Sequence, residues 1–423
     1  MAVSFIAGAS VVETVYRPRV VSTAFAAKTG ELVEIVPRWK TDHTTYVPIR
    51  PSNNLIRHGA LLFPSEPIEY GDIDKLLAEI ECHISRYVSL PRHAVVVSAA
   101  YVLLTWLYDA FNELPYLRFR GDYGTGKTRA LSVIGSLCYK AFFASGASTI
   151  SPIFHTLDTF KGTLIFDEAD FRFTDEKAEL VKILNNGNAR GFPVLRTHVS
   201  ATKEFNPRAF AIYGPKIVGM RRSYEDRALE SRFLTIEMEP GRFAGVPINL
   251  PESQKDEALG LRNKLLLYRL KNRLAAKLDP ELADEALEPR MNQILLPLLS
   301  VLPDPERQAL ILETALTLHA SLLSERSGSS EGQVLSVLAR LHAQPREGAL
   351  SVGEIADAFR QEFASEYERP ITNRWVGSIL RRLGIALYKS NGVFVLLPGQ
   401  GARIEALCRR YGIEQPADVE GTV

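Results

Sequence analysis

The stretch Gly121-Asp122-Tyr123-Gly124-Thr125-Gly126-Lys127-Thr128 decides how this chain of 423 residues is interpreted. It fits the pattern of a glycine, four residues and then Gly-Lys-Thr. Glycines let the backbone curl with its N–H groups pointing inward, and the dipole of a following helix favours an anion there. Residues 121–128, with Arg129 next to them, therefore predict a phosphate-binding loop. Lys127 can reach the β- and γ-phosphates, and the Thr128 hydroxyl can bind Mg²⁺.

The residues on either side of the loop test this prediction. Residues 116–120 alternate like a short strand, and after the loop Ala130, Leu131, Val133, Ile134 and Leu137 recur at helical spacing. A strand, a glycine loop and a helix, in that order, are what the motif requires. The alternative is a chance glycine turn.

A second motif follows in Thr163-Leu164-Ile165-Phe166-Asp167-Glu168, where an apolar strand ends in two acids, with Asp167 40 residues after Lys127. Asp167 is expected near Mg²⁺. Glu168 can orient and deprotonate the water that attacks the γ-phosphate. The alternative is an acidic strand end in a loop. Together the two motifs predict an enzyme that binds and hydrolyses ATP.

Composition excludes several other classes of protein. The net charge of +1 means that contact with nucleic acid must come from local patches. The cysteines form no CxxC pair and no metal-binding spacing, which favours reduced thiols in the cytoplasm. The N-terminus has no positively charged segment typical of a signal peptide. The apolar run 94–108 is shorter than the roughly 20 residues of a membrane span, so we expect a buried helix and no membrane partner.

The remaining periodicities outline the elements around the two motifs. Residues 1–70 are expected to form a small β-rich module with strands at 31–36 and 46–49. Further strands are expected at 141–144, 215–220 and 234–238. Helices are expected at 72–88, 93–111, 149–160, 175–184, 256–278 and 309–323.

Residues 192–196 and 203–212 flank a polar turn and predict a β-hairpin. Its tip carries Arg196, His198 and Lys203. In a ring such a hairpin could face a central channel and contact a nucleic-acid backbone. A solvated basic turn is the equally weighted alternative.

Residues from about 93 to 300 resemble AAA+ ATPases, and more closely the helicase-like AAA+ ATPases of phages, plasmids and other mobile elements. The resemblance covers about half of the chain. It depends on the loop at 121–128, Leu164-Ile165-Phe166-Asp167-Glu168-Ala169-Asp170, Ile183-Leu184-Asn185-Asn186-Gly187, Tyr213-Gly214-Pro215-Lys216 and Asp226-Arg227-Ala228-Leu229-Glu230-Ser231-Arg232.

The resemblance implies cofactors, partners and further site residues. ATP and Mg²⁺ would be the cofactors, and identical subunits would form a ring, expected to be a hexamer. Arg232 would be the arginine finger that completes a neighbouring subunit's site, with Arg227 as second choice. Arg290 would contact the γ-phosphate from the helical lid, or else form a surface ion pair. The family's polar sensor after the fourth strand is replaced here by Met220 and Arg221, which makes Arg221 a weak candidate.

The C-terminal part predicts a winged helix. Helices are expected at 334–341, 352–363 and 372–383, followed by a hairpin on Asn391-Gly392. Arg374, Arg381 and Arg382 on the third helix and Lys389 on the wing could contact DNA. A winged helix used for protein contacts is the alternative.

The fold class expected from these observations is α/β, with an AAA+ P-loop core, a helical lid, a small β-rich N-terminal module and a C-terminal winged helix. The domains are expected at 1–70, 71–245, 246–325 and 333–398, with a linker at 324–332 and a tail at 399–423. The leading interpretation is a DNA helicase of a mobile element. Alternatives are an ATP-switched assembly factor on DNA without unwinding activity, and a remodeller of protein substrates.

Overall fold

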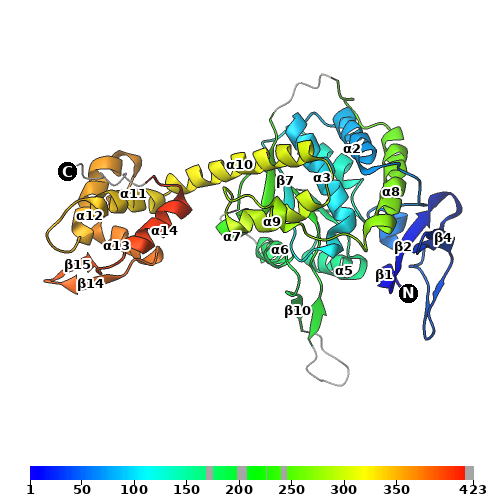
Figure 1. The fold of residues 1–423 in the computed structure, drawn as a ribbon, viewed down its shortest axis with the longest axis horizontal. Helices are drawn as coiled ribbons and strands as arrows, with labels where there is room; N and C mark the ends of the chain where they lie inside the picture. Colours follow the sequence, from blue (N-terminus) through cyan, green and yellow to red (C-terminus); the bar gives the residue numbers. More distant parts are fainter. Residues whose placement is uncertain (168–174, 198–206, 225, 240–244, 415–423) are drawn as a thin grey trace. The chain divides into compact units, whose positions relative to one another are not determined.

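The computed structural model describes residues 1–167, 175–197, 207–224, 226–239 and 245–414 (Figure 1). The chain divides into two compact units, Met1–Leu316 and Thr317–Val423. Glu168, His198 and Lys203 lie outside the described residues, and so does the side chain of Arg227.

The first unit contains a sheet of five parallel strands in the order β13-β7-β12-β9-β8. The strands span Tyr116–Arg120 (β7), Phe142–Ser145 (β8), Leu164–Asp167 (β9), Lys216–Met220 (β12) and Phe233–Glu237 (β13). Because all five run the same way, their carboxyl ends meet at one edge of the sheet, where ligands bind in open α/β folds. The phosphate loop follows β7 and the acidic pair begins at the end of β9, so both are at this edge. The sheet and its loop fit a P-loop ATPase core.

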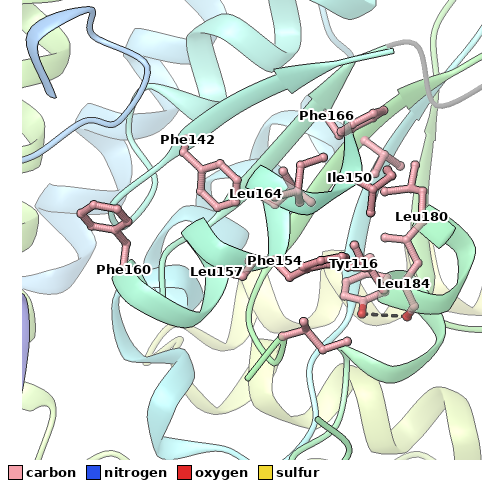
Figure 2. Packing of buried hydrophobic residues seen from close by; sticks show 14 of the residues in the cluster. Tyr116, Phe142, Ile150, Phe154, Leu157, Phe160, Leu164, Phe166, Leu180 and Leu184 are labelled. Carbon is pink, nitrogen blue, oxygen red and sulfur yellow. Dashed lines mark hydrogen bonds between the residues drawn. The ribbon is translucent and has the colours of Figure 1, made fainter. Parts of the chain in front are cut away.

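Helices cover both faces of the sheet because successive strand residues point to opposite sides. Leu164 and Phe166 of β9 pack in a hydrophobic cluster with α5 (Ile150–Phe160) and α6 (Asp175–Asn186), as Figure 2 shows. Between them, Ile165 faces α4 (Lys127–Gly135), where a Cβ on Gly135 would lie only 2.9 Å from Ile165 Cγ1. Such close packing fixes the C-terminal end of α4 against β9.

Helix α3 (Arg92–Leu107) is the most apolar element, and all its residues from Ala94 onward are buried. The segment Arg92–Ala110 is long and apolar enough to cross a membrane, but 83% of that window is buried inside the protein. This burial confirms the expected core helix. The helix that precedes it, α2, spans Ile73–Tyr87 and is capped by Asp72, whose side chain accepts a hydrogen bond from Lys75 N.

Four antiparallel strands form the N-terminal sheet: β1 (Ser4–Ala7), β2 (Ser10–Arg17), β3 (Ser22–Thr29) and β4 (Leu32–Val36). Glu13 of β2 is buried against the rest of the unit. It accepts hydrogen bonds from Arg269 Nε at 2.6 Å and Tyr139 Oη at 2.8 Å, and Lys140 Nζ lies 3.4 Å away. Burial alone would raise the pKa of Glu13, but Arg269 and Lys140 outweigh it and hold that pKa below its usual value.

The other elements of this unit are shorter or lie beyond the sheet. They are β5 (Trp39–Lys40), β6 (Thr45–Tyr46), α1 (Asn54–Arg57), β10 (Val194–Arg196), β11 (Arg208–Phe210), α7 (Arg227–Glu230), α8 (Ser253–Asn272) and α9 (Pro289–Ser300). The strand expected at 46–49 is limited to β6. The strand expected at 31–36 is β4, one member of a larger sheet.

The linker expected at 324–332 is wrong. Helix α10 spans Pro305–Ser327 and α11 spans Ser330–Ala343, so only two residues separate them. Ser329 caps α11 by accepting a hydrogen bond from Gly332 N. A Cβ on Gly332 would lie 2.3 Å from Arg326 O, so here glycine serves close backbone contact and not flexibility.

The second unit has its own hydrophobic core, formed by α11, α12 (Val352–Phe363), α13 (Asn373–Arg382), the hairpin β14 (Leu387–Ser390) and β15 (Val393–Leu396), and α14 (Gly401–Tyr411). Asn391 and Gly392 form the turn of the hairpin with φ of 47° and 85°. The tail expected at 399–423 is wrong for residues 401–411, because Ile404, Leu407 and Cys408 of α14 are buried in this core.

Candidate active site

The phosphate loop is shaped by its glycines. Gly124 and Gly126 have φ of 73° and 89°, a left-handed conformation that side chains with a Cβ rarely adopt. Gly121 is required for a different reason, since a Cβ there would lie 2.3 Å from Met238 O. The loop therefore folds tightly against the end of β13, and α4 begins directly after it at Lys127.

The structure brings three of the predicted residues together. Thr128 Oγ1 donates a hydrogen bond of 2.6 Å to Asp167 Oδ2, which joins the first turn of α4 to the end of β9. Lys127 Nζ donates to Gly121 O at 2.7 Å and to Asp122 O at 2.6 Å, so its ammonium group lies inside the curl of the loop. Thr125 Oγ1 closes the curl by donating to Asp122 O at 2.9 Å.

The same residues fit a magnesium ion. Mg²⁺ prefers oxygen ligands and is usually held by one or two protein groups, several waters and the substrate phosphates. Thr128 and Asp167 supply one hydroxyl and one carboxylate next to the loop. Among the described residues no group of three or more His, Cys, Asp or Glu side chains could hold a metal ion, and a nucleotide-bound Mg²⁺ needs none.

Gly219 of β12 belongs to this site although the sequence analysis missed it. A Cβ at this position would lie 2.9 Å from Asp167 Oδ1 and 2.8 Å from Leu131 Cδ1. Glycine therefore lets the Asp167 carboxylate lie beside the neighbouring strand. A glycine inside an otherwise apolar strand is a signal of close approach, and it could have identified this residue.

Two further residues at this edge have roles that differ from expectation. Arg129 was grouped with the cofactor-binding residues, but its guanidinium donates to Pro247 O at 2.5 Å and also to Ile248 O. Arg221 stacks on the ring of Tyr123 at 4.0 Å and donates to its hydroxyl. Arg221 thus contacts the loop through Tyr123.

Arg232 lies at the opposite edge of the sheet, immediately before β13. Its Nε donates to Asn188 Oδ1 at 3.0 Å, and its Nη1 donates to Asn185 Oδ1 at 2.6 Å and Ala228 O at 2.7 Å. Five strand residues at about 3.3 Å each place it roughly 16 Å from the phosphate loop of its own chain. An arginine there is too far away to reach its own loop.

A buried ion pair that sequence analysis missed anchors the segment carrying Arg232. Arg118 of β7 donates to both carboxylate oxygens of Glu230 at 2.6 Å, and both side chains are nearly buried. Glu230 also accepts from Tyr224 N at 2.6 Å. The pair fixes the short helix α7 to β7, the neighbour of the edge strand β13, and no local pattern in the sequence connects residues 118 and 230.

Lys216 fixes the neighbouring segment. Its ammonium group is fully buried and donates to Gly187 O, Ile212 O and Gly214 O at 2.9 to 3.1 Å. Burial lowers the pKa of Lys216 to about 7. These three bonds hold the loop that leads to Asn188, and so help to position Arg232.

Arg290 is not at the phosphate loop of its own chain. It lies at the start of α9 and lines a cavity of about 850 Å³ with Asn112, Glu113 and Gln293. Glu113 precedes β7, so this cavity belongs to the edge of the sheet where the strands begin. In this structure Arg290 therefore does not contact the phosphate loop of its own chain, and its role toward a γ-phosphate stays a prediction.

The basic hairpin forms as expected, with Arg196 of β10 opposite Arg208 of β11. The side chain of Arg196 is 41% exposed, but its guanidinium is held by its neighbours. It forms an ion pair with Glu179 and stacks on the ring of Phe154 at 4.8 Å. The structure thus uses Arg196 to fasten the base of the hairpin to α5 and α6.

The residues proposed for DNA contact in the second unit are exposed. Arg374, Arg381 and Arg382 are on α13, and Lys389 is on β14. Arg381 lies over the ring of Phe394 at 5.0 Å, and Arg382 pairs with Glu331 at 3.3 Å. Arg374, Arg381 and Lys389 thus form no ion pair with a described acid, which leaves their charge available.

Comparison with known proteins found structural likenesses only. No family model and no curated protein matches the chain. The C-terminal region of NrS-1 is similar over 92% of this chain and 96% of its own, with 12% identity and a TM-score of 0.39. The JCV helicase (61% and 65% covered, 15% identity) has a TM-score of 0.26, and Cdc6p from Pyrobaculum aerophilum (81% and 96% covered, 12% identity) one of 0.19. At such TM-scores these likenesses carry no conclusion about this chain's function.

Proposed function

We propose that this chain is an ATP-hydrolysing AAA+ motor that assembles as a ring of identical subunits, a hexamer, and acts on DNA as a replicative helicase of a mobile element. The contact between Thr128 and Asp167 is the observation that carries the ATPase proposal. It joins Thr128, in the first turn of the helix after the glycine loop, to an acid at the end of a buried strand. That arrangement suits a triphosphate with its Mg²⁺.

Each residue of the site has a defined task in this proposal. Loop N–H groups and Lys127 bind the β- and γ-phosphates, and Thr128 and Asp167 hold Mg²⁺, which neutralises charge on the phosphate oxygens. Glu168 orients the attacking water. Arg232 of an adjacent subunit stabilises the charge that develops on the transferred phosphoryl group. Because Arg232 lies at the opposite end of the strands from its own loop, a head-to-tail ring would complete every site.

The DNA part of the proposal is supported by the exposed cations of the second unit. Arg374, Arg381 and Lys389 lie on a helix and a hairpin that suit contact with a duplex. The test is ATP hydrolysis with and without single- and double-stranded DNA, together with strand displacement. A motor should hydrolyse ATP faster on DNA and separate strands. ATP-dependent DNA binding with slow turnover and no strand separation would favour the assembly-factor alternative.

Two substitutions test the chemistry. Lys127→Ala should abolish both ATP hydrolysis and strand displacement. Glu168→Gln should abolish hydrolysis but leave ATP binding intact, because it removes the base and keeps the phosphate loop. Unchanged unwinding by Lys127→Ala would end the proposal. The matched control is Lys277→Ala, which removes an exposed lysine away from the loop and should behave as wild type.

A further inference from the structure

We propose that Arg290 acts together with Arg232 on the nucleotide held by the adjacent copy of this chain, so that each subunit offers its neighbour two arginines. This inference rests on the proposed function. It assigns Arg290 to the nucleotide of the neighbouring subunit because Arg290 lies at the edge of the sheet where the strands begin, away from the phosphate loop of its own chain.

The first step is position. Arg290 lines its cavity beside Asn112 and Glu113, and Arg190 N donates to Asn112 O at 2.9 Å. Leu114 N donates to Asn188 O at 2.9 Å, and the Asn188 side chain accepts from Arg232 Nε. The segment beside Arg290 and the segment that holds Arg232 are therefore hydrogen-bonded to each other. Both arginines lie at the edge where the strands begin.

The second step is charge. Burial, and next the positive charge of Arg290, lower the pKa of Arg232. Two guanidinium groups within electrostatic reach repel each other, and the repulsion grows where water is excluded. The acids near this pair include Glu113 and Asp226, and Asp226 is bonded to Asn185 and to the backbone of α7. A pair of cations held together in this way suits a polyanion that comes from outside the chain.

The third step is unused hydrogen-bonding capacity. Arg290 Nε is buried and has no hydrogen-bond partner among the described residues. Arg232 uses Nε and Nη1 for its anchors, and no bond from its Nη2 is found within the part of the chain that the structure describes. Buried donors normally have partners, so donors without one at a cation pair point to a missing acceptor. A triphosphate presented by the adjacent copy supplies oxygen acceptors and negative charge together.

The test mixes two inactive variants in equal amounts and measures ATP hydrolysis. In a head-to-tail ring of Lys127→Ala and Arg290→Ala subunits, about a quarter of the interfaces combine an intact loop with an intact arginine pair. We therefore expect about a quarter of the wild-type rate from this mixture. A mixture of Arg232→Ala with Arg290→Ala should stay inactive, because every interface lacks at least one arginine.

If Arg290 acted on its own nucleotide, the two mixtures would exchange results, and the proposal would fall. It would also fall if Arg290→Ala alone hydrolysed ATP as wild type does, or if neither mixture recovered activity. The mixture of Lys127→Ala with Arg232→Ala is the positive control. An inactive wild-type protein would instead overturn the proposed ATPase function, so the two failures are distinguishable.

A second readout does not depend on hydrolysis. Fluorescent ATP analogue binding is measured on dilute protein, below the concentration at which native mass spectrometry detects assemblies. Arg290→Ala should then bind with wild-type affinity, because its own phosphate loop is intact. A tenfold loss in the dilute protein would contradict the proposal. Arg290→Gln, which keeps a polar group beside Glu113, guards against misfolding, and failure of both variants to assemble would identify a purely structural role.

Discussion

At the scale of single residues, the site depends on glycines as much as on charged side chains. Gly121 allows the loop to fold against Met238, and Gly219 allows Asp167 to lie beside β12. In our proposal Gly121 belongs to the loop whose N–H groups bind the phosphates, whereas Gly219 touches no phosphate. Both glycines decide where the phosphate-binding and Mg²⁺-binding groups are held, because a Cβ at either position would enter space that another atom occupies.

Gly219→Ala tests this directly. The new methyl group would displace the Asp167 carboxylate by a few tenths of an ångström and weaken its contact with Thr128. We expect the Mg²⁺ concentration for half-maximal ATP hydrolysis to rise roughly tenfold, as is typical when the support of a metal ligand is altered. The control is Gly260→Ala in α8, where no atom lies within 4 Å and alanine should stabilise the helix by about 0.5–1 kcal/mol. Equal Mg²⁺ requirements for the two variants would contradict the role of Gly219.

At the scale of elements, the Arg118–Glu230 pair joins α7 to β7. Glu230→Gln would leave the Arg118 guanidinium buried without a counter-charge, so we expect a loss of about 3–5 kcal/mol in the free energy of unfolding. The exposed pair between Arg120 and Glu237 is the comparison, and Glu237→Gln should lose no more than about 1 kcal/mol. Urea denaturation of both variants measures the difference. Similar losses would show that burial of the first pair is unimportant.

The buried ammonium group of Lys216 should make the free energy of unfolding depend on pH. The pKa of Lys216 falls from an ordinary 10.5 to about 7 on burial. Between these values the unfolded chain keeps a proton that the folded chain has lost, so stability rises with pH, by at most about 1.4 kcal/mol per pH unit. Lys216→Met should remove this rise, whereas Lys271→Met, at an exposed ion pair with Glu69, should keep it. Denaturation curves from pH 7 to 10 that are parallel for wild type and Lys216→Met would refute the assignment.

Local patterns predicted the elements well and their distant contacts poorly. The glycine loop, the acidic strand end and the alternation of strands and helices are read from neighbouring residues, which is why the loop, β9 and the Asn391-Gly392 hairpin were predicted. The partner of Arg118 lies 112 residues away in sequence, and the place of Arg290 depends on how α9 packs. Composition also misled at residues 324–332, where serines and glycines cap and pack helices in place of forming a linker.

At the scale of the whole molecule, the second unit has a complete core of its own. We expect a fragment of residues 329–414 to fold alone, with a cooperative thermal transition by circular dichroism, because α11 to α14 bury their apolar faces against one another. The same fragment should bind duplex DNA. Arg374→Ala and Arg381→Ala should each reduce the slope of log affinity against log salt concentration by about 1 in magnitude.

Arg340→Ala is the control for this prediction, since Arg340 is exposed in the same unit but pairs with Glu362 at 2.7 Å. It should leave DNA affinity unchanged. A folded fragment that does not bind DNA, or that loses affinity equally in all three variants, would favour protein contacts for this unit.

The strand β13 has a consequence for how subunits could work in turn. It begins directly after Arg232, the arginine proposed to act on a neighbour, and it is followed by Met238, whose carbonyl oxygen fills the space where a Cβ on Gly121 would lie. This five-residue edge strand is paired with β7 along its whole length, so we expect a displacement at one of its ends to reach the other. In the proposed ring, nucleotide turnover in one subunit would thus displace the pocket of the next subunit. The subunits would then hydrolyse ATP one after another around the ring.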